Sequence, residues 1–270
     1  MHSLNTEFAA ALAAWQANRR QELATAESWL GMAGLFWLEP GRNVLGSAAD
    51  CPLRLPAGPA CAGEVVWEPE RDLLFWQATD GVMKPLVTDR DGAPTTVDLE
   101  NWSFFVVDRD RRLALRLRDR EWAQSRPFAG LDYFPPAPEW RIEARWLALP
   151  EPVRIEVPNV AGELRPVEIA WQAVFVHAGS EVCLLPMSVD ENEVFFVFRD
   201  RSSGRESYGA GRFLKAVRPV GEVITLDFNR AYNPPCAFTP FATCPLPPPE
   251  NWLPFAVPAG ELKYCGAVAH

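Results

Sequence analysis

Proline is concentrated in one part of this chain, and that concentration limits what the segment can become. Nine of the 26 prolines lie between Pro234 and Pro258. Because proline fixes the backbone φ angle and donates no backbone hydrogen bond, this segment cannot form a helix or an interior strand. The surrounding residues also carry aromatic side chains that argue against disorder: Phe228, Tyr232, Phe238, Phe241, Trp252 and Phe255. We therefore expect residues 226–260 to form a stiff, shaped loop, of the kind that often has a function.

The charge balance argues against two classes of partner. With 26 basic and 35 acidic residues the net charge is −9, so we expect neither nucleic acid nor a membrane surface as a partner. The basic residues between Arg109 and Arg120 alternate with acidic ones, which predicts a salt-bridged face exposed to solvent. No apolar run approaches the roughly 20 residues of a spanning helix, and no basic residue precedes the apolar run Phe8–Trp15. We expect a cytoplasmic protein.

The cysteines do not have the spacing of a metal site. No two of the six form a Cys-x-x-Cys pair, the spacing typical of structural zinc; they are Cys51, Cys61, Cys183, Cys236, Cys244 and Cys265. We expect buried and reduced thiols, as in a reducing compartment.

The hydrophobic period changes once along the chain. Residues 5–28 predict a helix, because Phe8, Leu12 and Trp15 recur at helical spacing. From Leu35 onward the period is two, between turn-forming residues, which predicts short strands. The expected strands are 35–38, 44–46, 64–67, 73–77, 84–87, 97–99, 103–107, 113–117, 142–148, 153–157, 166–176, 182–185, 194–198, 208–214 and 222–228.

This pattern predicts a mainly β fold, an antiparallel barrel or sandwich of many short strands with an N-terminal helix. Residues 35–38 and 44–46 are expected to form a hairpin or to be joined by a tight turn. In 112–118, leucines alternate with arginines, which indicates a half-buried antiparallel strand.

The domain organisation follows from the same pattern. We expect residues 1–30 to form a helix packed on the body, and 31–270 to form a single β domain ending in the proline-rich loop. A weak seam lies near residues 121–140, but it has no flexible linker that would prove two domains.

The segment 199–214 is the first candidate for a site. Residues Gly209–Gly211 invite the close approach of another backbone or of a ligand. In one interpretation this segment is a hairpin with a glycine bulge and a surface arginine. In the other, the planar guanidinium of Arg212 holds a carboxylate or phosphate, with Tyr208 beside it.

A second group of polar residues lies at the entry to the proline-rich loop. Asp227 and Asn229 are two residues apart and share a side if the strand continues, with Tyr232 and Asn233 close behind. They either satisfy loop backbone groups or bind a ligand or a hard cation, with Glu261 as an additional carboxylate.

Cys236 and Cys244 lie within the loop. A nucleophilic cysteine needs a base, and the only histidine away from the termini is His177, which follows an apolar run and suits a packed role better. No Gly-x-Ser-x-Gly elbow, His-Glu-x-x-His motif or Walker loop is present.

The run Asp227–Phe238, followed by Cys244-Pro245 and Pro248–Asn251, resembles the signature of the family called domain of unknown function 1684. Ser207–Leu214, Leu35–Leu38 with Gly41 and Gly46, and Arg126–Phe128 with Gly130 resemble its other blocks, so the resemblance extends roughly from Trp29 to Gly260. The resemblance brings no activity with it, but it implies that these blocks belong to one module.

The leading hypothesis is a small-molecule-binding β protein whose polar pocket lies between the turn at 208–212 and the loop at 227–251. In it Arg212 holds an anionic small molecule, Tyr208 and Tyr232 donate or stack, and Asp227 orients Asn229 or acts as a general base. Asn233 and Cys236 complete the predicted ligand contacts. Whether the protein is an enzyme, for instance of hydrolase type, and which cofactor it would use stay open.

Two other hypotheses stay open as well. In one, the protein is a non-catalytic interaction or dimerisation module, with a homodimer as the partner and a surface made by Phe128, Phe134, Phe241 and Trp252. In the other, weaker one, Asp227, Glu261 and cysteine thiolates bind a metal.

Overall fold

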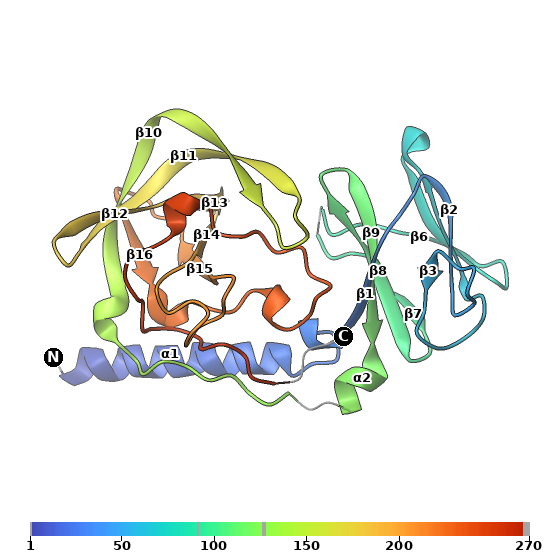
Figure 1. Cartoon of the computed structure of the whole chain (residues 1–270), viewed down its shortest axis with the longest axis horizontal. Helices are drawn as coiled ribbons and strands as arrows, with labels where there is room; N and C mark the ends of the chain where they lie inside the picture. The colour runs from blue at the N-terminus through green and yellow to red at the C-terminus, as the bar shows by residue number, and fades with distance from the viewer. Residues whose placement is uncertain (1, 91, 126–127, 267–270) are drawn as a thin grey trace. The chain divides into compact units, whose positions relative to one another are not determined.

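The computed structural model describes residues 2–90, 92–125 and 128–266, and it is mostly β-strand with a long N-terminal helix (Figure 1). The predicted mainly β, antiparallel fold class is confirmed. The contacts between Cα atoms divide the described chain into two compact units, residues 2–25 with 128–266 and residues 26–125. Their boundary falls within the predicted seam. Whether residues 31–270 fold as a single cooperative domain stays a prediction.

The unit of residues 26–125 contains two antiparallel sheets, apart from one short parallel pair. The first sheet has the order β1-β9-β8-β7 and the second the order β3-β2-β4-β5-β6. Its elements are η1 (Trp29–Gly31), β1 (Met32–Trp37), β2 (Gly41–Gly46), β3 (Leu53–Arg54), β4 (Gly63–Glu68), η2 (Pro69–Arg71), β5 (Leu73–Ala78), β6 (Met83–Pro85), β7 (Val97–Leu99), β8 (Trp102–Arg109), β9 (Arg112–Asp119) and α2 (Arg120–Ser125).

Of the two alternatives for 35–38 and 44–46, the hairpin is wrong, and a short connection, residues 38–40, joins the two strands. Strand β1 pairs with β9, and β2 pairs with β4, so the two segments belong to different sheets. Local turn chemistry indicated that the chain bends between them. It could not show which distant strand would supply the hydrogen bonds.

Strand β9 confirms its predicted buried leucine face, since Leu113, Leu115 and Leu117 all belong to the core of this unit. The opposite face is not the solvent face that we expected. Arg116 is only 4% exposed, and its guanidinium lies 4.9 Å from the centre of the Trp29 ring. Arg118 lies over Phe105 in the same way, at 4.6 Å. Aromatic rings therefore cover these arginines, and cation–π contact replaces part of their hydration.

The other unit combines the N-terminal helix with the remaining strands. Its antiparallel sheets have the orders β12-β11-β10-β16 and β13-β14-β15. Its elements are α1 (His2–Leu23), η3 (Pro138–Trp140), β10 (Arg141–Pro158), β11 (Leu164–His177), β12 (Ser180–Leu184), β13 (Pro186–Val189), β14 (Glu193–Phe198), β15 (Arg212–Val217), β16 (Val223–Asp227), η4 (Phe228–Arg230), η5 (Pro235–Ala237) and η6 (Pro249–Asn251).

Two strands of this unit differ from their predicted bounds. The segments 142–148 and 153–157 join in the single strand β10, with an irregular register between Ala148 and Val153 opposite β11. Figure 1 shows β10 and β11 as a long, curved pair of ribbons. The strand expected from Tyr208 begins only at Arg212, because turns occupy the preceding residues.

Helix α1 packs on this unit through its apolar stripe. Leu12 is buried, and the Trp15 ring meets the edge of the Tyr133 ring with their centres 6.4 Å apart. The helix ends at Leu23, five residues earlier than expected, and Ser28 then caps the turn η1 by accepting from the Leu30 amide. No helix in the described ranges is long and apolar enough to cross a membrane.

The proline-rich loop is confirmed as an ordered segment without a helix or a long strand. Between 231 and 260 it contains the short turns η5 and η6 and single bridges to Phe213, Asn159 and Arg199. Several of its side chains are fully buried, including Phe238, Thr239, Asn251 and Val257. The loop is therefore part of the core of its unit.

Candidate functional site

Arg212 makes a buried ion pair within the unit. Its Nη2 donates to Asp200 Oδ2 at 2.8 Å and to the Val257 carbonyl at 2.9 Å, and its Nη1 donates to the Ala259 carbonyl. Neither Arg212 nor the Asp200 carboxylate is exposed to solvent. The sequence pattern predicts that this guanidinium holds an anionic ligand. A ligand could reach it only by displacing the protein's own carboxylate, so Arg212 here binds its own chain.

Gly211 makes this arrangement sterically feasible. Its φ angle is +98°, and a Cβ atom on it would lie 2.5 Å from the Phe198 carbonyl oxygen and 3.2 Å from Pro247 Cγ. Only glycine fits such a place, since it has no side chain and adopts positive φ without strain. The predicted close backbone approach at Gly209–Gly211 is confirmed, and the neighbour is this unit's own backbone.

Asp227 and Asn229 bond to the loop rather than sharing a strand face. Strand β16 ends at Asp227, whose Oδ1 accepts from the backbone N and from Nδ2 of Asn229 at 3.2 and 3.0 Å. Asn229 in turn accepts from the Ala137 amide at 2.8 Å and donates to the Ala137 carbonyl at 2.9 Å. The Asn229 side chain thus satisfies the backbone groups of Ala137. This agrees with the interpretation in which these residues satisfy loop backbone groups, and not with the one in which they bind a ligand.

Asp227 also lines a surface cavity of about 550 Å³ in the same unit. Phe8 of α1 and the end of β15 contribute to this cavity. The Asp227 carboxylate pairs there with Arg230, with Oδ2 and Nε 3.5 Å apart.

Asn233 belongs to a second buried polar network, which ties α1 to the loop. Its backbone amide donates to Glu261 Oε2 at 2.7 Å, and its Nδ2 donates to the Leu262 carbonyl at 2.7 Å. Arg19 donates to Glu261 Oε1 at 3.1 Å and lies over the Tyr232 ring at 4.8 Å. Burial raises the pKa of Glu261 above its ordinary value, against the opposing effect of Arg19.

These partners do not form the metal site that was the weaker alternative. The Glu261 carboxylate is bound by Arg19 and Asn233, and Asp227 by Asn229 and Arg230. In the ranges that the structure describes, no three His, Cys, Asp or Glu side chains are grouped closely enough to hold a metal ion.

Tyr208, Cys236 and Cys244 are brought together. The Tyr208 hydroxyl donates to the Cys236 carbonyl at 2.9 Å, and the Cys236 amide donates to Cys244 Sγ at 3.3 Å. The pKa of Tyr208 is raised, chiefly by burial. The pKa of the Cys236 thiol is lowered, chiefly because the Cys244 thiol hydrogen-bonds it. His177 instead stacks between the rings of Trp140 and Phe255, with centres 5.0 and 4.0 Å away, as expected for a packed histidine.

A surface pocket of about 460 Å³ adjoins the buried ion pair, and we name it the arginine pocket. It is lined by Arg199, Asp200, Arg201, Ser203, Arg205, Trp252, Leu253 and Pro254. The pocket therefore lies between the turn after β14 and the last part of the proline-rich loop. The sequence predicts a pocket between 208–212 and 227–251. The observed pocket lies close to these ranges in the chain, but different residues line it.

The backbone of the arginine pocket is held on both sides. Arg199 donates its amide to the Asn251 carbonyl at 3.0 Å and accepts from the Leu253 amide at 2.7 Å. The Arg201 amide donates to the Phe255 carbonyl at 3.0 Å. Asp200 Oδ1 accepts from the Ser202 amide at 2.7 Å, so the buried carboxylate also shapes the turn. These hydrogen bonds hold the backbone at Arg199 and Arg201, and both residues line the same pocket.

The arginine pocket is strongly basic. Arg199, Arg201 and Arg205 are exposed, and none has a carboxylate partner among the described residues. Four exposed arginines elsewhere pair with carboxylates, in Arg42–Glu64, Arg71–Glu68, Arg90–Asp108 and Arg145–Glu181. Trp252 is 53% exposed, and the Arg199 guanidinium lies 5.3 Å from the centre of its ring. This arrangement can hold an anion beside an aromatic surface.

Sequence reasoning did not select these three arginines. One signal was present, since Arg199 and Arg201 flank Asp200 directly after a buried apolar strand. The same reasoning preferred Arg212, because it stands beside glycines, and burial cannot be read from that pattern.

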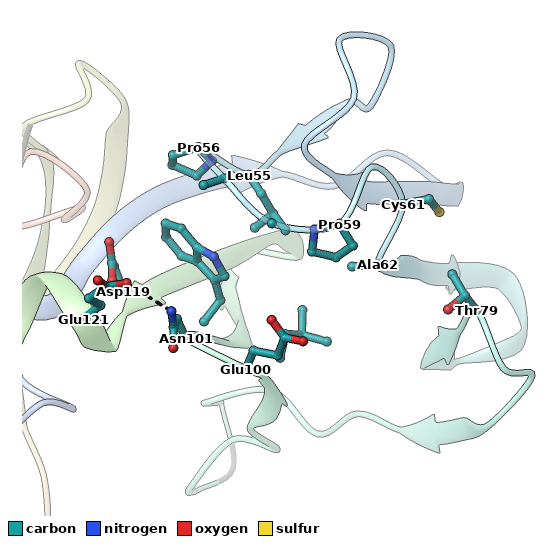
Figure 2. Close-up of a pocket in the computed structure, with 14 residues that line it drawn as sticks. Leu55, Pro56, Pro59, Cys61, Ala62, Thr79, Glu100, Asn101, Asp119 and Glu121 are labelled. Carbon is teal, nitrogen blue, oxygen red and sulfur yellow. Dashed lines mark hydrogen bonds between the residues drawn. The ribbon is translucent and has the colours of Figure 1, made fainter.

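A second pocket, of about 440 Å³, lies in the other unit and has the opposite charge. Figure 2 shows the wall made by Leu55, Pro56 and Pro59 and, facing it, Glu100 and Asn101. Asn101 Nδ2 donates to Glu121 Oε2 at 3.0 Å, and Asp119 adds another carboxylate. The buried Trp102 lines it as well.

The comparisons with known proteins concern mainly the unit that contains the arginine pocket. The sequence model described as "Protein of unknown function (DUF1684)" matches residues 126–262, which include every residue lining that pocket. The chain is also similar to an uncharacterized protein of Haloarcula marismortui, known from a solution NMR structure. The two are 35% identical with a TM-score of 0.41, over 50% of this chain and 77% of that one. No curated protein matches. The match to just over half of the sequence shows that this chain belongs to the DUF1684 family.

Proposed function

We propose that the protein binds a small anionic molecule in the arginine pocket. The observation that carries this proposal is the convergence of three exposed guanidiniums, without carboxylate partners in the described chain, around a partly exposed tryptophan. Guanidiniums hold carboxylates and phosphates through paired, charge-assisted hydrogen bonds. An anion would therefore supply the counter-charge that this pocket lacks.

The remaining lining residues suggest the shape of the ligand. Trp252, Leu253 and Pro254 form an apolar wall next to the arginines. A flat or apolar body could stack on Trp252 while its carboxylate or phosphate meets Arg201 and Arg205. We therefore propose an aromatic or aliphatic carboxylate or phosphate ester as the class of ligand.

The residues that the sequence singled out take a supporting part in this proposal. The Arg212–Asp200 pair holds the turn that forms one pocket wall, and the Asn229 and Asn233 networks hold neighbouring parts of the proline-rich segment. For Arg212, Asn229 and Asn233 to contact a ligand as predicted, their hydrogen bonds within the protein would have to break. The proposed function is ligand binding. We also propose that the protein is cytoplasmic, because its six scattered cysteines suit a reducing compartment.

The alternative function, a protein-interaction surface, has less support from the aromatic residues. Phe134 lies 5.8 Å from the Arg212 guanidinium, and Phe128 stacks on Tyr264 with ring centres 6.1 Å apart. Trp252 remains the most exposed of the four aromatic residues. It belongs to the arginine pocket.

A thermal-shift titration of the full chain tests the proposal. The probes are inorganic phosphate, citrate, benzoate and phenyl phosphate at constant ionic strength. A ligand at 100 times its Kd stabilises a protein by about 2.7 kcal/mol, which raises Tm by roughly 5–10 °C for a protein of this size. The expected shift should be lost in Arg201→Gln and Arg205→Gln. It should persist in Arg154→Gln, which changes an exposed arginine of β10 outside the pocket.

A second measurement separates binding in the pocket from general salt effects. Phenyl phosphate should quench tryptophan fluorescence in the wild type, and this quenching should be much weaker in Trp252→Phe. Equal shifts in all variants, or no shift with any of the four anions, would overturn the proposal.

A further inference from the structure

The proline-rich loop brings two cysteines close together, and neither of them lines the arginine pocket. Cys236 and Cys244 are eight residues apart, and the Cys236 amide donates to Cys244 Sγ at 3.3 Å. The neighbouring Cys244 side chain also lowers the pKa of the Cys236 thiol. Since N and Cα are about 1.46 Å apart, Cys244 Sγ lies within about 4.8 Å of the Cys236 Cα. The Cys244 sulfur thus lies beside the atom from which the Cys236 side chain projects, a proximity that suits a disulfide.

Both cysteines are held in place by the surrounding framework. The Cys244 carbonyl accepts from the Val160 amide at 3.0 Å, and the Leu246 amide donates to the Pro158 carbonyl at 2.8 Å. On the other side, the Tyr208 hydroxyl holds the Cys236 carbonyl. The two cysteines are therefore held close together before oxidation, which removes most of the entropic cost of joining them.

The two thiols also differ in access. Cys236 is partly exposed, whereas Cys244 is 5% exposed. An oxidant in solution would reach Cys236 first, and Cys244 would be the resolving thiol behind it.

We propose that Cys236 and Cys244 are a redox modification site, at which a peroxide converts the two thiols into a reversible disulfide. The Cys236 thiolate attacks one oxygen of the peroxide and the O–O bond breaks, which forms a sulfenic acid; the departing hydroxide (or alkoxide) takes up the proton that the thiol had released and leaves as water (or an alcohol). The Cys244 sulfur then attacks the sulfenic sulfur, an S–S bond forms, and a second water leaves with the thiol proton. A low-molecular-weight thiol reverses the reaction by disulfide exchange.

Cys183 provides an internal comparison. It is also partly exposed, but burial and Glu181 raise its pKa, and its Sγ donates to Gln172 Oε1 at 2.9 Å. Less of Cys183 is therefore the reactive thiolate at neutral pH. Cys236 should be oxidised before Cys183.

The test uses the full chain with the two exposed cysteines removed, as Cys61→Ser/Cys265→Ser, to prevent links between molecules. Hydrogen peroxide is added to the native protein, and the intact mass is followed over time. The expected product has lost two hydrogen atoms and regains them with dithiothreitol. Chymotrypsin cleaves after Phe238 and Phe241, between the two cysteines, so a linked pair of peptides should appear and should separate on reduction.

Single variants in the same background identify the order of events. Cys244→Ser should accumulate a sulfenic acid at Cys236 that a cyclic diketone probe traps. Cys236→Ser should not lose the two hydrogen atoms. The proposal is overturned if the native protein gains oxygen at Cys183 first, or if Cys236 is oxidised to stable oxyacids with Cys244 intact beside it.

Discussion

The Arg212 guanidinium donates to the Asp200 carboxylate at 2.8 Å in a place that solvent does not reach. This pair links the start of β15 to the turn after β14, and its other hydrogen bonds reach the carbonyls of Val257 and Ala259. Arg212 therefore connects the turn at Asp200, 12 residues before it, with the segment at Val257, 45 residues after it. Asp200 also lines the arginine pocket.

Asp200→Asn should destabilise the protein strongly, because it leaves the Arg212 charge buried without its partner. Breaking one side of a buried pair costs about 3–5 kcal/mol. Urea unfolding followed by circular dichroism measures the loss. Glu181→Gln is the matched control, because it breaks the exposed Arg145–Glu181 pair and should cost no more than about 1 kcal/mol. Similar losses in both variants would contradict the structural role of the buried pair.

Glu261 should make stability fall as the pH rises. Burial raises its pKa above the ordinary value of 4.5, so between the two values the folded state binds more protons than the unfolded state. The stabilising contribution is complete below pH 4.5 and is lost as the pH rises through the pKa of the folded state. In Glu261→Gln this dependence should disappear.

Urea midpoints measured at several pH values above 4.5 test this point. The advantage of the wild type over Glu261→Gln should be greatest at the acidic end. Glu250→Gln, an exposed change in the same loop, serves as the control and should follow the wild-type curve. Parallel curves for the wild type and Glu261→Gln would show that Glu261 does not titrate as its environment indicates.

The tyrosines should resist ionisation in the folded protein. The pKa of each of the four is raised, chiefly by burial: Tyr133, Tyr208, Tyr232 and Tyr264. The unfolded chain should titrate near the ordinary value of 10.0, so stability is retained below that pH and lost above it. Phenolate absorbance should therefore rise only together with unfolding. The same titration in urea is the control, and coincident curves would contradict the prediction.

Gly211→Ala should cost more than an alanine substitution at another glycine with positive φ. The left-handed conformation alone costs a residue with a side chain about 1–2 kcal/mol. At Gly211 the new Cβ would also lie 2.5 Å from the Phe198 carbonyl, whereas at Gly162 no atom lies within 4 Å. The difference in urea midpoints between the two alanine variants measures the clash. Equal midpoints would mean that the Phe198 backbone moves freely.

The periodicity of the sequence determined much of the local structure. The alternation at Leu113, Leu115 and Leu117 placed those side chains in a core, and the spacing of Phe8, Leu12 and Trp15 indicated the helix. The glycines before Arg212 marked a close approach of two backbones. Each of these features depends on interactions within a few residues, or on the chemistry of one residue type.

The candidate site could not be predicted from local pattern, because it depends on which residues are buried and on which distant segments meet. Arg212 and Arg201 have the same side chain, and nothing local to either shows that one is buried against Asp200 while the other faces solvent. Likewise, the turn chemistry around residues 39–41 did not reveal that β1 would pair with β9.

The mainly β fold, the N-terminal helix and the rigid proline-rich loop are therefore predictable from the residue pattern, because proline geometry and hydrophobic period act locally. Which polar residues are buried and which surround a pocket depends on the folded arrangement of the chain. Burial and ion pairing depend on segments that are distant in the chain, such as Asp200 and Val257, and those meet only when the chain has folded.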